Sequence, residues 1–413
     1  MMISIEQAHQ LVAAHVQPLS PRRLPLPEAF QAKLAEDVAS PFDSPPFDKS
    51  TVDGFAIQSA DAQLELAIVE QVTAGHTPKH RVAPGVAARL MTGAPLPEGA
   101  DAVVKIEDCT LTEQGTVIIP HDLRRASAHV LSQGKAFRKG DKVLSHGDRL
   151  TPAAIGLLAE LGYQSVVAQP PPRIAILPTG DELAAPGAPL RPGEIYNSNG
   201  PMLAALISQI GGLPIDLGVA VDDPEDLHSH FLRGLDYDVL LIAGGVSAGV
   251  KDLAPGILEE LGVQKIFHKI RMRPGKPLWF GKFDHADRTT YVFGLPGNPV
   301  SALTTARLFV APTLASLAGC AYAPPTMRRG RITCEASHRG RRPTYHPFRW
   351  SLQQETPSQH DVPGIEPLAW QGSADLAAMA RADGWIFLPE GDYDLAAGSL
   401  VDVVEIDPRA AIS

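Results

Sequence analysis

The spacing of apolar residues changes along the chain and predicts where helices and strands form. Two sets of apolar residues in the first forty positions recur at helical spacing: Ile5, Ala8, Val12 and Val16, then Phe30, Leu34 and Val38. We therefore predict two amphipathic helices there, joined by a proline-rich link. A third helix is predicted over 151–162, because Thr151 can cap it, Pro152 suits its first turn and Gly162 can end it.

Shorter apolar runs, broken by glycine and proline, fill much of the stretch between these helices. Runs such as DAVVKIED and GTVIIP have the length and the flanking residues of β-strands. This pattern predicts a β-rich insertion.

From Pro172 onward, apolar runs alternate with helical patterns. Each of four runs is followed by a loop and then a helical segment: RIAIL, PIDLGVAV, YDVLLIAGG and TTYVFG. Such alternation predicts a parallel sheet covered by helices on both faces, with Pro201 and Pro224 near helix starts. After Cys320, a basic stretch leads to short strands such as GWIFLPEG and SLVDVVEI, which predict a small separate β domain.

These patterns give an expected domain division. We expect a discontinuous helix-containing linker domain (1–45 and 136–170), a β-rich insertion domain (46–135), a parallel-sheet α/β domain (171–322) and a C-terminal β domain (323–413).

Composition narrows the class of protein. The 413 residues suffice for about three or four domains, and 44% hydrophobic residues with 20% charged ones are ordinary for a globular chain. A net charge of −10 argues against nucleic-acid binding, which needs a basic surface. The three cysteines (Cys109, Cys320 and Cys334) have no paired spacing, which favours a reducing cytoplasm.

Neither export nor a membrane span is expected. The N-terminus lacks a basic segment followed by an apolar one. The longest apolar stretch, near 301–320, carries Arg307 and Pro312 in its interior.

Candidate chemistry gathers in the loops that follow the predicted parallel strands, where ligands of open α/β sheets bind. Acids stand in PTGDEL (Asp181 and Glu182), AVDDPED (Asp222 and Asp223) and GGVSAGVKD (Asp252). Asp223 alone is best explained as a helix cap before Pro224. Acids at several strand ends nevertheless favour an Mg²⁺ site beside phosphate, since capping does not require them there.

Other residues in these loops suit anions. The amides of Gly244 and Gly245 and the Ser247 hydroxyl can hold an oxyanion at a helix start. Lys269, Arg273 and Lys276 flank a rigid Pro-Gly turn, so they form either a solvated charged face or a fixed anion site.

Two turns of the insertion are ambiguous. Asp53 precedes Gly54 in FDKSTVDGFAI, and Thr92 precedes Gly93 in MTGAPLPEGADAVV. Both sites are explained as well by tight turns as by chemistry.

Seven motifs in order resemble those of the molybdopterin molybdenumtransferase family, MoeA, which is shared with the E domain of gephyrin. They run through nearly the whole chain: FDKSTVDGFAI, MTGAPLPEGADAVV, PTGDEL, AVDDPED, GGVSAGVKD, RMRPGKPLWFG and LPGNPVSA. The C-terminal part resembles the family more loosely, through QGSADLAAMARADGWIFLPEG.

The resemblance implies an α/β multidomain fold and an elongated homodimer. Its parallel α/β sandwich domain would resemble molybdopterin adenylyltransferases, beside a β-rich insertion domain, a mixed helical linker domain and a small C-terminal β-barrel. The implied activity is insertion of molybdate into adenylylated molybdopterin with release of AMP, in the presence of Mg²⁺. Molybdopterin adenylyltransferases and molybdoenzymes are the implied protein partners.

The resemblance also assigns residues. Asp222 and Asp252 would hold Mg²⁺ against the pyrophosphate, supported by Glu182. Lys269, Arg273 and Lys276 would neutralise phosphate or molybdate. Asp53 and Thr92 would reach the same cleft from the partner subunit. A rigid loop followed by a helix start would line the pterin and molybdate pocket: Pro296, Gly297, Asn298, Pro299 and Ser301.

The chain departs from the family pattern at a few positions. Thr51, Val52 and Phe55 replace alanine, methionine and tyrosine, and Val250 and Lys251 stand in a loop that usually carries a further acid. The family places an arginine near molybdate in the segment HRGRRPTYHPFR, where Arg341, Arg342 and Arg349 are equal candidates.

Two alternative functions remain open on the sequence alone. The parallel-sheet domain could support a molybdopterin adenylyltransferase, which would release pyrophosphate from ATP. A non-catalytic scaffold like gephyrin is the other alternative, although it has no need of acids at several strand ends.

Overall fold

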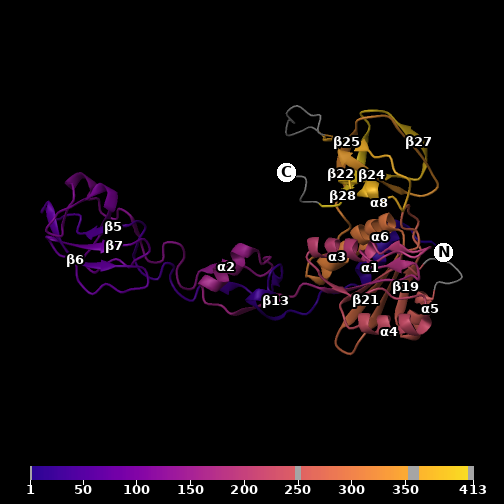
Figure 1. Ribbon diagram of the computed structural model, residues 1–413, viewed down its shortest axis with the longest axis horizontal. Coiled ribbons are helices and arrows are strands. Elements are labelled where there is room, and N and C mark those ends of the chain that lie inside the picture. Colours follow the sequence, from indigo (N-terminus) through magenta and orange to yellow (C-terminus); the bar gives the residue numbers. More distant parts are fainter. Residues whose placement is uncertain (1, 247–252, 352–361, 408–413) are drawn as a thin grey trace. The chain divides into compact units, whose positions relative to one another are not determined.

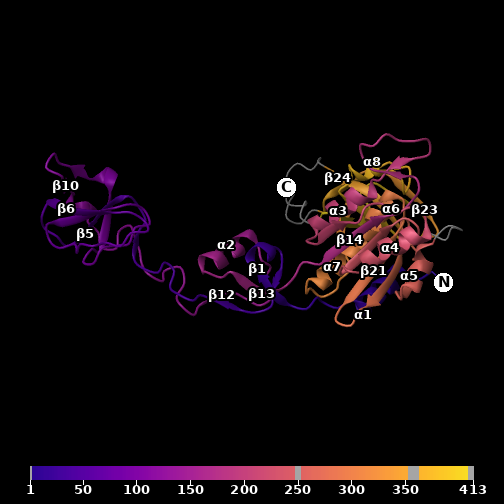
Figure 2. The same ribbon diagram turned by 60° about the horizontal axis from the view of Figure 1, so that its bottom comes forward.

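The computed structural model describes residues 2–246, 253–351 and 362–407. The chain forms two compact units, Met1–Arg22 with Gln169–Ser413, and Arg23–Ala168. Figures 1 and 2 show both units.

The first unit is built on a six-stranded sheet of order β17-β14-β18-β21-β20-β19. Its strands, in chain order, are β14 (Arg173–Pro178), β17 (Leu213–Asp216), β18 (Val239–Ala243), β19 (Gln264–His268), β20 (Trp279–Asp284) and β21 (Thr289–Leu295). β17, β14, β18 and β21 run parallel, as the alternating pattern predicts.

The last two strands correct the expectation of a wholly parallel sheet. β20 pairs antiparallel with both β21 and β19. The cause is chain length, because a parallel crossover needs a dozen or more residues. Only residues 285–288 separate β20 from β21, so that pair forms a hairpin.

Helices cover both faces of this sheet (Figure 2). Ile174 and Ile176 of β14 face one core, whereas Ala175 and Leu177 face the other, as the two-residue period of a strand requires. The first core is covered by α1 (Ile5–His15), α3 (Asn199–Gln209), α6 (Pro299–Thr305) and α7 (Ala311–Leu317). The second core is covered by α4 (Pro224–Gly234) and α5 (Ala254–Glu260).

Helix α1 packs on the sheet of the first unit. Ile5, Ala8 and Val12 are buried in the same core as Ile174. The expected domain division groups this helix with the linker domain instead. That four-domain division remains a proposal.

His9 anchors α1 in this core. Its ring stacks on Phe309 with 4.4 Å between centroids, and its Nδ1 is hydrogen-bonded to the Tyr322 hydroxyl at 2.9 Å. Burial lowers the pKa of His9 from 6.5 to about 4, a shift that the nearby charge of Glu6 partly opposes. The imidazole is therefore neutral in the folded protein at pH 5, whereas it is mostly protonated in the unfolded chain.

The first prediction concerns acid stability. Because the pKa of His9 is lower in the folded protein than in the unfolded chain, the neutral imidazole stabilises the folded state fully above pH 6.5. This contribution to the free energy of unfolding is lost as the pH falls toward 4. Lowering the pH from 7 to 5 should reduce the free energy of unfolding of this unit by about 2 kcal/mol through His9 alone. Denaturant titrations of wild type and His9→Gln at both pH values isolate the contribution of His9 to the free energy of unfolding, since all other groups titrate in both proteins. An equal pH dependence in the two proteins would contradict the prediction.

A continuous helix, Pro299–Leu317, follows β21. α6 and α7 are joined by a π-helical turn, η4 (Ala306–Val310). In the described part of the chain, this stretch has the length and composition of a membrane span, but 83% of it is buried inside the protein. The pattern is typical of a core helix.

The C-terminal part of this unit is a small closed barrel, as expected, of order β22-β25-β24-β26-β28. Its strands are β22 (Arg328–Ile332), β24 (Thr344–Trp350), β25 (Gly364–Pro367), β26 (Gly384–Leu388) and β28 (Leu400–Glu405). A separate pair, β23 (Ala336–Gly340) with β27 (Gly391–Leu395), and the short helix α8 (Leu376–Met379) accompany it.

The second unit is mostly β-structure, as the short apolar runs predict. A six-stranded sheet of order β8-β5-β7-β6-β10-β9 has a core on each face. Its strands are β5 (Gly54–Ile57), β6 (Glu65–Val72), β7 (Val86–Leu90), β8 (Ala102–Lys105), β9 (Thr110–Leu111) and β10 (Thr116–Ile118).

Smaller elements complete this unit. A three-stranded sheet contains β1 (Arg22–Pro25), β13 (Ser165–Gln169) and β2 (Lys33–Leu34). Two strand pairs are β4 (Lys49–Ser50) with β11 (Val130–Leu131), and β3 (Val38–Ala39) with β12 (Lys142–Leu144). Helix α2 (Pro152–Glu160) is confirmed with its cap, since the Thr151 hydroxyl accepts from the Ala154 amide at 3.2 Å.

The helix predicted around 30–38 is wrong. Leu34 and Val38 are buried on short strands, and Phe30 is exposed. A spacing of four residues also fits the two-residue period of a strand, so the pattern did not distinguish the two structures. Pairing with β13 and β12, far along the chain, selects the strands.

Candidate active site

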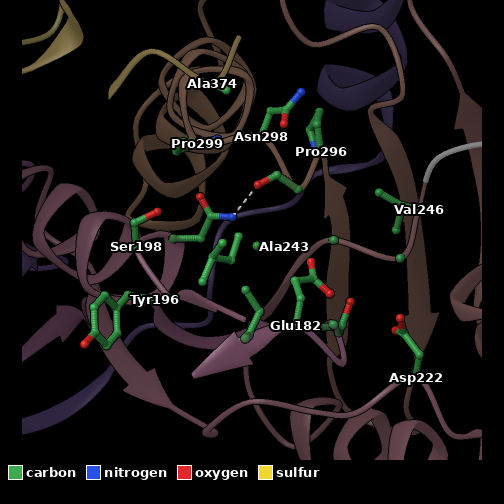
Figure 3. Close-up of a pocket in the computed structure, with 18 of the residues that line it drawn as sticks. Glu182, Tyr196, Ser198, Asp222, Ala243, Val246, Pro296, Asn298, Pro299 and Ala374 are labelled. Carbon is green, nitrogen blue, oxygen red and sulfur yellow. Dashed lines mark hydrogen bonds between the residues drawn. The ribbon is translucent and has the colours of Figure 1, made fainter. Parts of the chain in front are cut away.

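A cavity of about 580 Å³ lies at the carboxyl edge of the parallel strands, and Figure 3 shows its lining. We call it the acidic cavity because its charged side chains are Glu182 and Asp222. The loops that follow β14, β17, β18 and β21 all contribute to it. Eight residues predicted for the site line it: Glu182, Asp222, Gly244, Gly245, Pro296, Gly297, Asn298 and Pro299.

The two acids are placed by loops that bind each other. The Asp222 amide donates to Asp181 Oδ1 at 3.0 Å, which joins the loop after β17 to the loop after β14. Asp223 caps α4, because its carboxylate accepts from the amides of Glu225 and Asp226. Asp223 is thus the helix cap that the sequence indicates, and Asp222 lines the cavity.

Gly244 and Gly245 let the backbone after β18 pass close to the end of β14. Their φ angles are +114° and +63°, a region that side chains disfavour. A Cβ at Gly244 would lie 2.5 Å from the Thr179 carbonyl oxygen. The glycines therefore shape the cavity wall sterically.

The loop from Pro296 to Pro299 is held on both sides. The Gly297 carbonyl accepts from Asn199 Nδ2 at 2.7 Å, the bond drawn in Figure 3, and Asn298 Nδ2 donates to Ser373 Oγ at 2.8 Å. Asn298 precedes α6 but its side chain does not cap the helix. Its carboxamide instead joins the sheet to the segment before α8.

A second cavity, of about 410 Å³, adjoins the first and shares Pro277, Pro296 and Asn298 with it. We call it the basic cavity because Arg273, Lys276 and Arg342 line it and, among the residues that the structure describes, no acid does. The barrel contributes to its wall through Arg342 and the segment 370–373.

Backbone bonds fix the basic cavity at the contact between sheet and barrel. The Arg273 amide donates to the Pro343 carbonyl at 2.9 Å, and the Tyr345 amide donates to the Arg273 carbonyl at 2.7 Å. Arg342 Nη1 donates to the Met272 carbonyl at 3.1 Å. The guanidinium of Arg342 and the backbone of Arg273 are thus held in place. Together with Lys276 and the buried Ser301, they give the cavity a composition that suits a small multivalent oxyanion.

Three family descriptions match the chain in order. They are the MoeA N-terminal region, domains I and II (residues 3–162), a probable molybdopterin binding domain (175–316) and the MoeA C-terminal region, domain IV (329–406). The molybdopterin molybdenumtransferase of Haemophilus influenzae is 33% identical over 97% of this chain and 98% of its own length. The chain belongs to the MoeA family.

Other relatives agree over the same length. The molybdopterin molybdenumtransferase of Synechococcus elongatus is 34% identical over 98% of this chain and 99% of its own. Among solved structures, the molybdopterin biosynthesis MoeA protein of Pyrococcus horikoshii matches with a TM-score of 0.71 and 31% identity, over 98% of this chain and 99% of its own. The MoeA fold thus covers nearly the whole chain.

The two MoeA motifs of the second unit are joined by hydrogen bonds between Asp53 and Thr92. Asp53 Oδ1 accepts two hydrogen bonds from Thr92, from the amide at 2.7 Å and from the hydroxyl at 2.8 Å. These bonds, the amide first, hold the pKa of the Asp53 carboxyl below its usual value. Gly54 begins β5 without a positive φ, and a Cβ there would lie 2.1 Å from the Val104 carbonyl oxygen. Asp53 therefore stands before a strand as an exposed, ionised carboxylate rather than in a tight Asp-Gly turn.

Not every predicted residue falls in these cavities. Ser247 and Asp252 lie outside the described residues, as do Val250 and Lys251. Lys269 lines neither the acidic nor the basic cavity.

The structure singles out one of the three candidate arginines of the MoeA pattern. Arg342 lines the basic cavity, whereas Arg341 and Arg349 are exposed and do not. Sequence reasoning left all three out of the site. The signal that separates them is packing against the Met272 carbonyl, which no local pattern contains.

The acidic cavity fits a hard cation that shares its ligands with a substrate. Within 2–246, 253–351 and 362–407, no cluster of three His, Cys, Asp or Glu side chains could enclose a metal ion. Mg²⁺ does not need such a cage, because it commonly binds one or two carboxylates together with phosphate oxygens and water. Glu182 and Asp222, both labelled in Figure 3, supply hard oxygen ligands of this kind.

Proposed function

We propose that this chain inserts molybdate into adenylylated molybdopterin and releases AMP, in molybdenum cofactor biosynthesis. Water cleaves the pyrophosphate link, so that AMP leaves and the molybdopterin keeps its own phosphate. The two dithiolene sulfurs of the pterin then bind the molybdenum of molybdate in place of one oxo ligand, which leaves as water with the two thiol protons.

The adjoining cavities carry this proposal. One offers carboxylates and glycine backbone to a nucleotide-like pyrophosphate, and the other offers three cations to an oxyanion. They share the wall formed by Pro277, Pro296 and Asn298, so both ligands would lie next to each other. Proximity of this kind is what a transfer reaction needs.

The roles of the charged residues follow from their cavities. Asp222 and Glu182 would hold Mg²⁺, which would neutralise the pyrophosphate, and Asp252, outside the described residues, remains a proposed third ligand. Arg273, Lys276 and Arg342 would bind molybdate, with Ser301 donating a hydrogen bond. Gly244, Gly245, Ser247 and the loop Pro296–Pro299 would position the substrate, and Lys269 remains a proposed contact.

A homodimer with a shared active site completes the proposal. Thr92 holds the Asp53 carboxylate in place through two hydrogen bonds, and this carboxylate would act in the active site of the partner subunit. The enzyme would work in the cytoplasm, receive its substrate from a molybdopterin adenylyltransferase and hand its product to molybdoenzymes.

The deciding experiment uses the purified full chain with Mg²⁺, molybdate and adenylylated molybdopterin. We expect AMP release together with molybdenum-loaded molybdopterin. The same protein given ATP and unmodified molybdopterin should yield no pyrophosphate. Pyrophosphate release without AMP release would instead identify an adenylyltransferase. If neither pyrophosphate nor AMP were released, the non-catalytic scaffold would be the remaining alternative.

The second prediction tests the basic cavity. Lys276→Ala should weaken molybdate binding by about 10-fold, because it removes one charge-assisted contact from a three-cation site. Stability should change little, since Lys276 is exposed. Calorimetric titration of molybdate at two salt concentrations measures the effect, which should shrink as salt screens the site.

Lys265→Ala is the matched control. Lys265 is an exposed lysine on β19 that forms an ion pair with Glu259 of α5, and it lines neither cavity. Its molybdate affinity should equal that of wild type. Equal losses in the two variants would mean that net charge, rather than the basic cavity, attracts molybdate.

A further inference from the structure

The wall of the basic cavity contains a tryptophan. Within the described part of the chain, Trp370 is the single aromatic side chain that lines this cavity. The other lining residues are arginine, lysine, glycine, proline and small polar residues. The three cations already suit an oxyanion, so charge neutralisation does not explain an indole at this wall.

The indole of Trp370 is braced by the barrel. The residue is partly buried, because part of it packs against the first core while it also lines the basic cavity. Its ring stands nearly perpendicular to that of His346, with 5.8 Å between centroids and 76° between planes. His346 is itself fixed, since its Nε2 donates to the Leu368 carbonyl at 2.9 Å.

The backbone that follows Trp370 is also held in place. The Gln371 amide donates to Asp375 Oδ2 at 2.9 Å, and the Val300 amide of α6 donates to the Ser373 carbonyl at 3.1 Å. Trp370 thus lies on a segment tied to the helix that begins beside both cavities. A side chain restrained in this way loses little conformational entropy when a ligand binds to it.

The chemistry of molybdopterin brings a flat ring system to this wall. The two dithiolene carbons belong to a pyran ring that is fused to the pterin. A dithiolene that meets molybdate in the basic cavity therefore carries the fused rings into the same region. Aromatic side chains stack on heterocyclic rings of this kind.

We propose that Trp370 is the stacking surface for the pterin ring system of the substrate. The inference rests on the proposed function, because it takes the basic cavity as the site where the dithiolene meets molybdate. Trp370 would then contribute to the affinity for the pterin half of the substrate and not to the affinity for its AMP half.

The test measures binding to the full chain without Mg²⁺ and without turnover. Unmodified molybdopterin is titrated, under anaerobic conditions, into wild type, Trp370→Leu and Trp370→Phe. Trp370→Leu keeps an apolar side chain but removes the aromatic face, so molybdopterin should bind about 10-fold more weakly. AMP and molybdate, titrated separately, should bind to all three proteins with equal affinity.

Trp370→Phe separates the ring face from the indole N–H. Phenylalanine keeps an aromatic face but cannot donate a hydrogen bond to an oxyanion. Its affinity for molybdopterin should therefore stay within about 3-fold of wild type, because stacking depends on the face. A loss as large as that of Trp370→Leu would overturn the inference, since the N–H and not the face would then bind the ligand.

Tryptophan fluorescence gives a readout that a merely structural role would not change. The chain has four tryptophans, and a stacked pterin should quench the emission of Trp370. Trp350→Phe is the matched control, because Trp350 is partly buried against Phe348 on β24 and lines neither cavity. Molybdopterin should quench wild type and Trp350→Phe to a similar extent. That part of the quenching should be missing in Trp370→Phe even when the ligand is bound.

The outcomes separate this inference from the proposed function. Wild-type affinity of Trp370→Leu for molybdopterin would overturn the inference, as would full quenching in Trp370→Phe. Parallel losses of molybdopterin and molybdate binding in Trp370→Leu would also overturn it, because Trp370 would then only shape the cavity. A wild-type chain that binds neither molybdopterin nor molybdate would contradict the proposed function itself.

Discussion

Asp222→Asn should reduce AMP release by at least about 100-fold while the protein remains folded. Asp222 lines the acidic cavity at the end of the β17 loop, where a hard carboxylate is the ligand that Mg²⁺ prefers. Even the mutation of a residue that only hydrogen-bonds to a metal ligand commonly lowers metal affinity or activity about 10–100-fold. AMP release at limiting Mg²⁺ measures the loss, and raising Mg²⁺ should restore part of it.

Asp223→Asn provides the matched control. The adjacent acid caps α4 through the amides of Glu225 and Asp226, and asparagine caps helices as well as aspartate does. This variant has the same change in charge but should keep near-normal turnover. Near-normal AMP release by Asp222→Asn at limiting Mg²⁺, or equal losses in the two variants, would show that the metal assignment is wrong.

Mixed subunits should recover activity if the active site is shared. Asp53→Asn and Asp222→Asn should each be nearly inactive as homodimers. In a heterodimer, one of the two clefts combines Asp222 of the first chain with Asp53 of the second, so that cleft is intact. Random exchange makes about half of the dimers heterodimers, so activity should approach about a quarter of wild type by two-fold symmetry.

The control for this mixture pairs two variants whose changes both lie in the acidic cavity. Asp222→Asn and Glu182→Gln both alter the acidic cavity, so their heterodimer has no intact cleft and should stay inactive. Exchange of subunits is verified by mass spectrometry of differently tagged chains. Verified exchange without recovery in the Asp53 and Asp222 mixture would mean that both acids act within one chain, or that Asp53 has no part in turnover.

The sequence by itself determined most of the sheet and which of its loops line the acidic cavity. Alternating apolar runs and helical segments predict parallel strands, and parallel strands place their following loops at one edge. Residues 182, 222, 244 and 298 meet there for that reason, although they are far apart in the chain. The caps at Thr151 and Asp223 were predictable because a cap and its helix are neighbours in sequence.

Local spacing failed where it fits two structures equally. The apolar positions at 30, 34 and 38 suit a helical face or one face of a strand, and distant strands decide between them. α1 was predicted correctly as a helix, but its packing on the sheet of the first unit depends on which distant surface buries Ile5 and His9.

Only the tertiary structure decided which residues of the barrel belong to the basic cavity. Arg341, Arg342 and Arg349 have the same chemistry, and only the bond of Arg342 to the Met272 carbonyl places one of them there. Among the described residues, Asn199 Oδ1 and Thr179 Oγ1 have no hydrogen-bond partner, which the sequence does not reveal, because whether a polar atom is satisfied depends on every group packed around it. The pattern of apolar residues determines which loops meet, whereas long-range packing determines which side chains line the cavities between them.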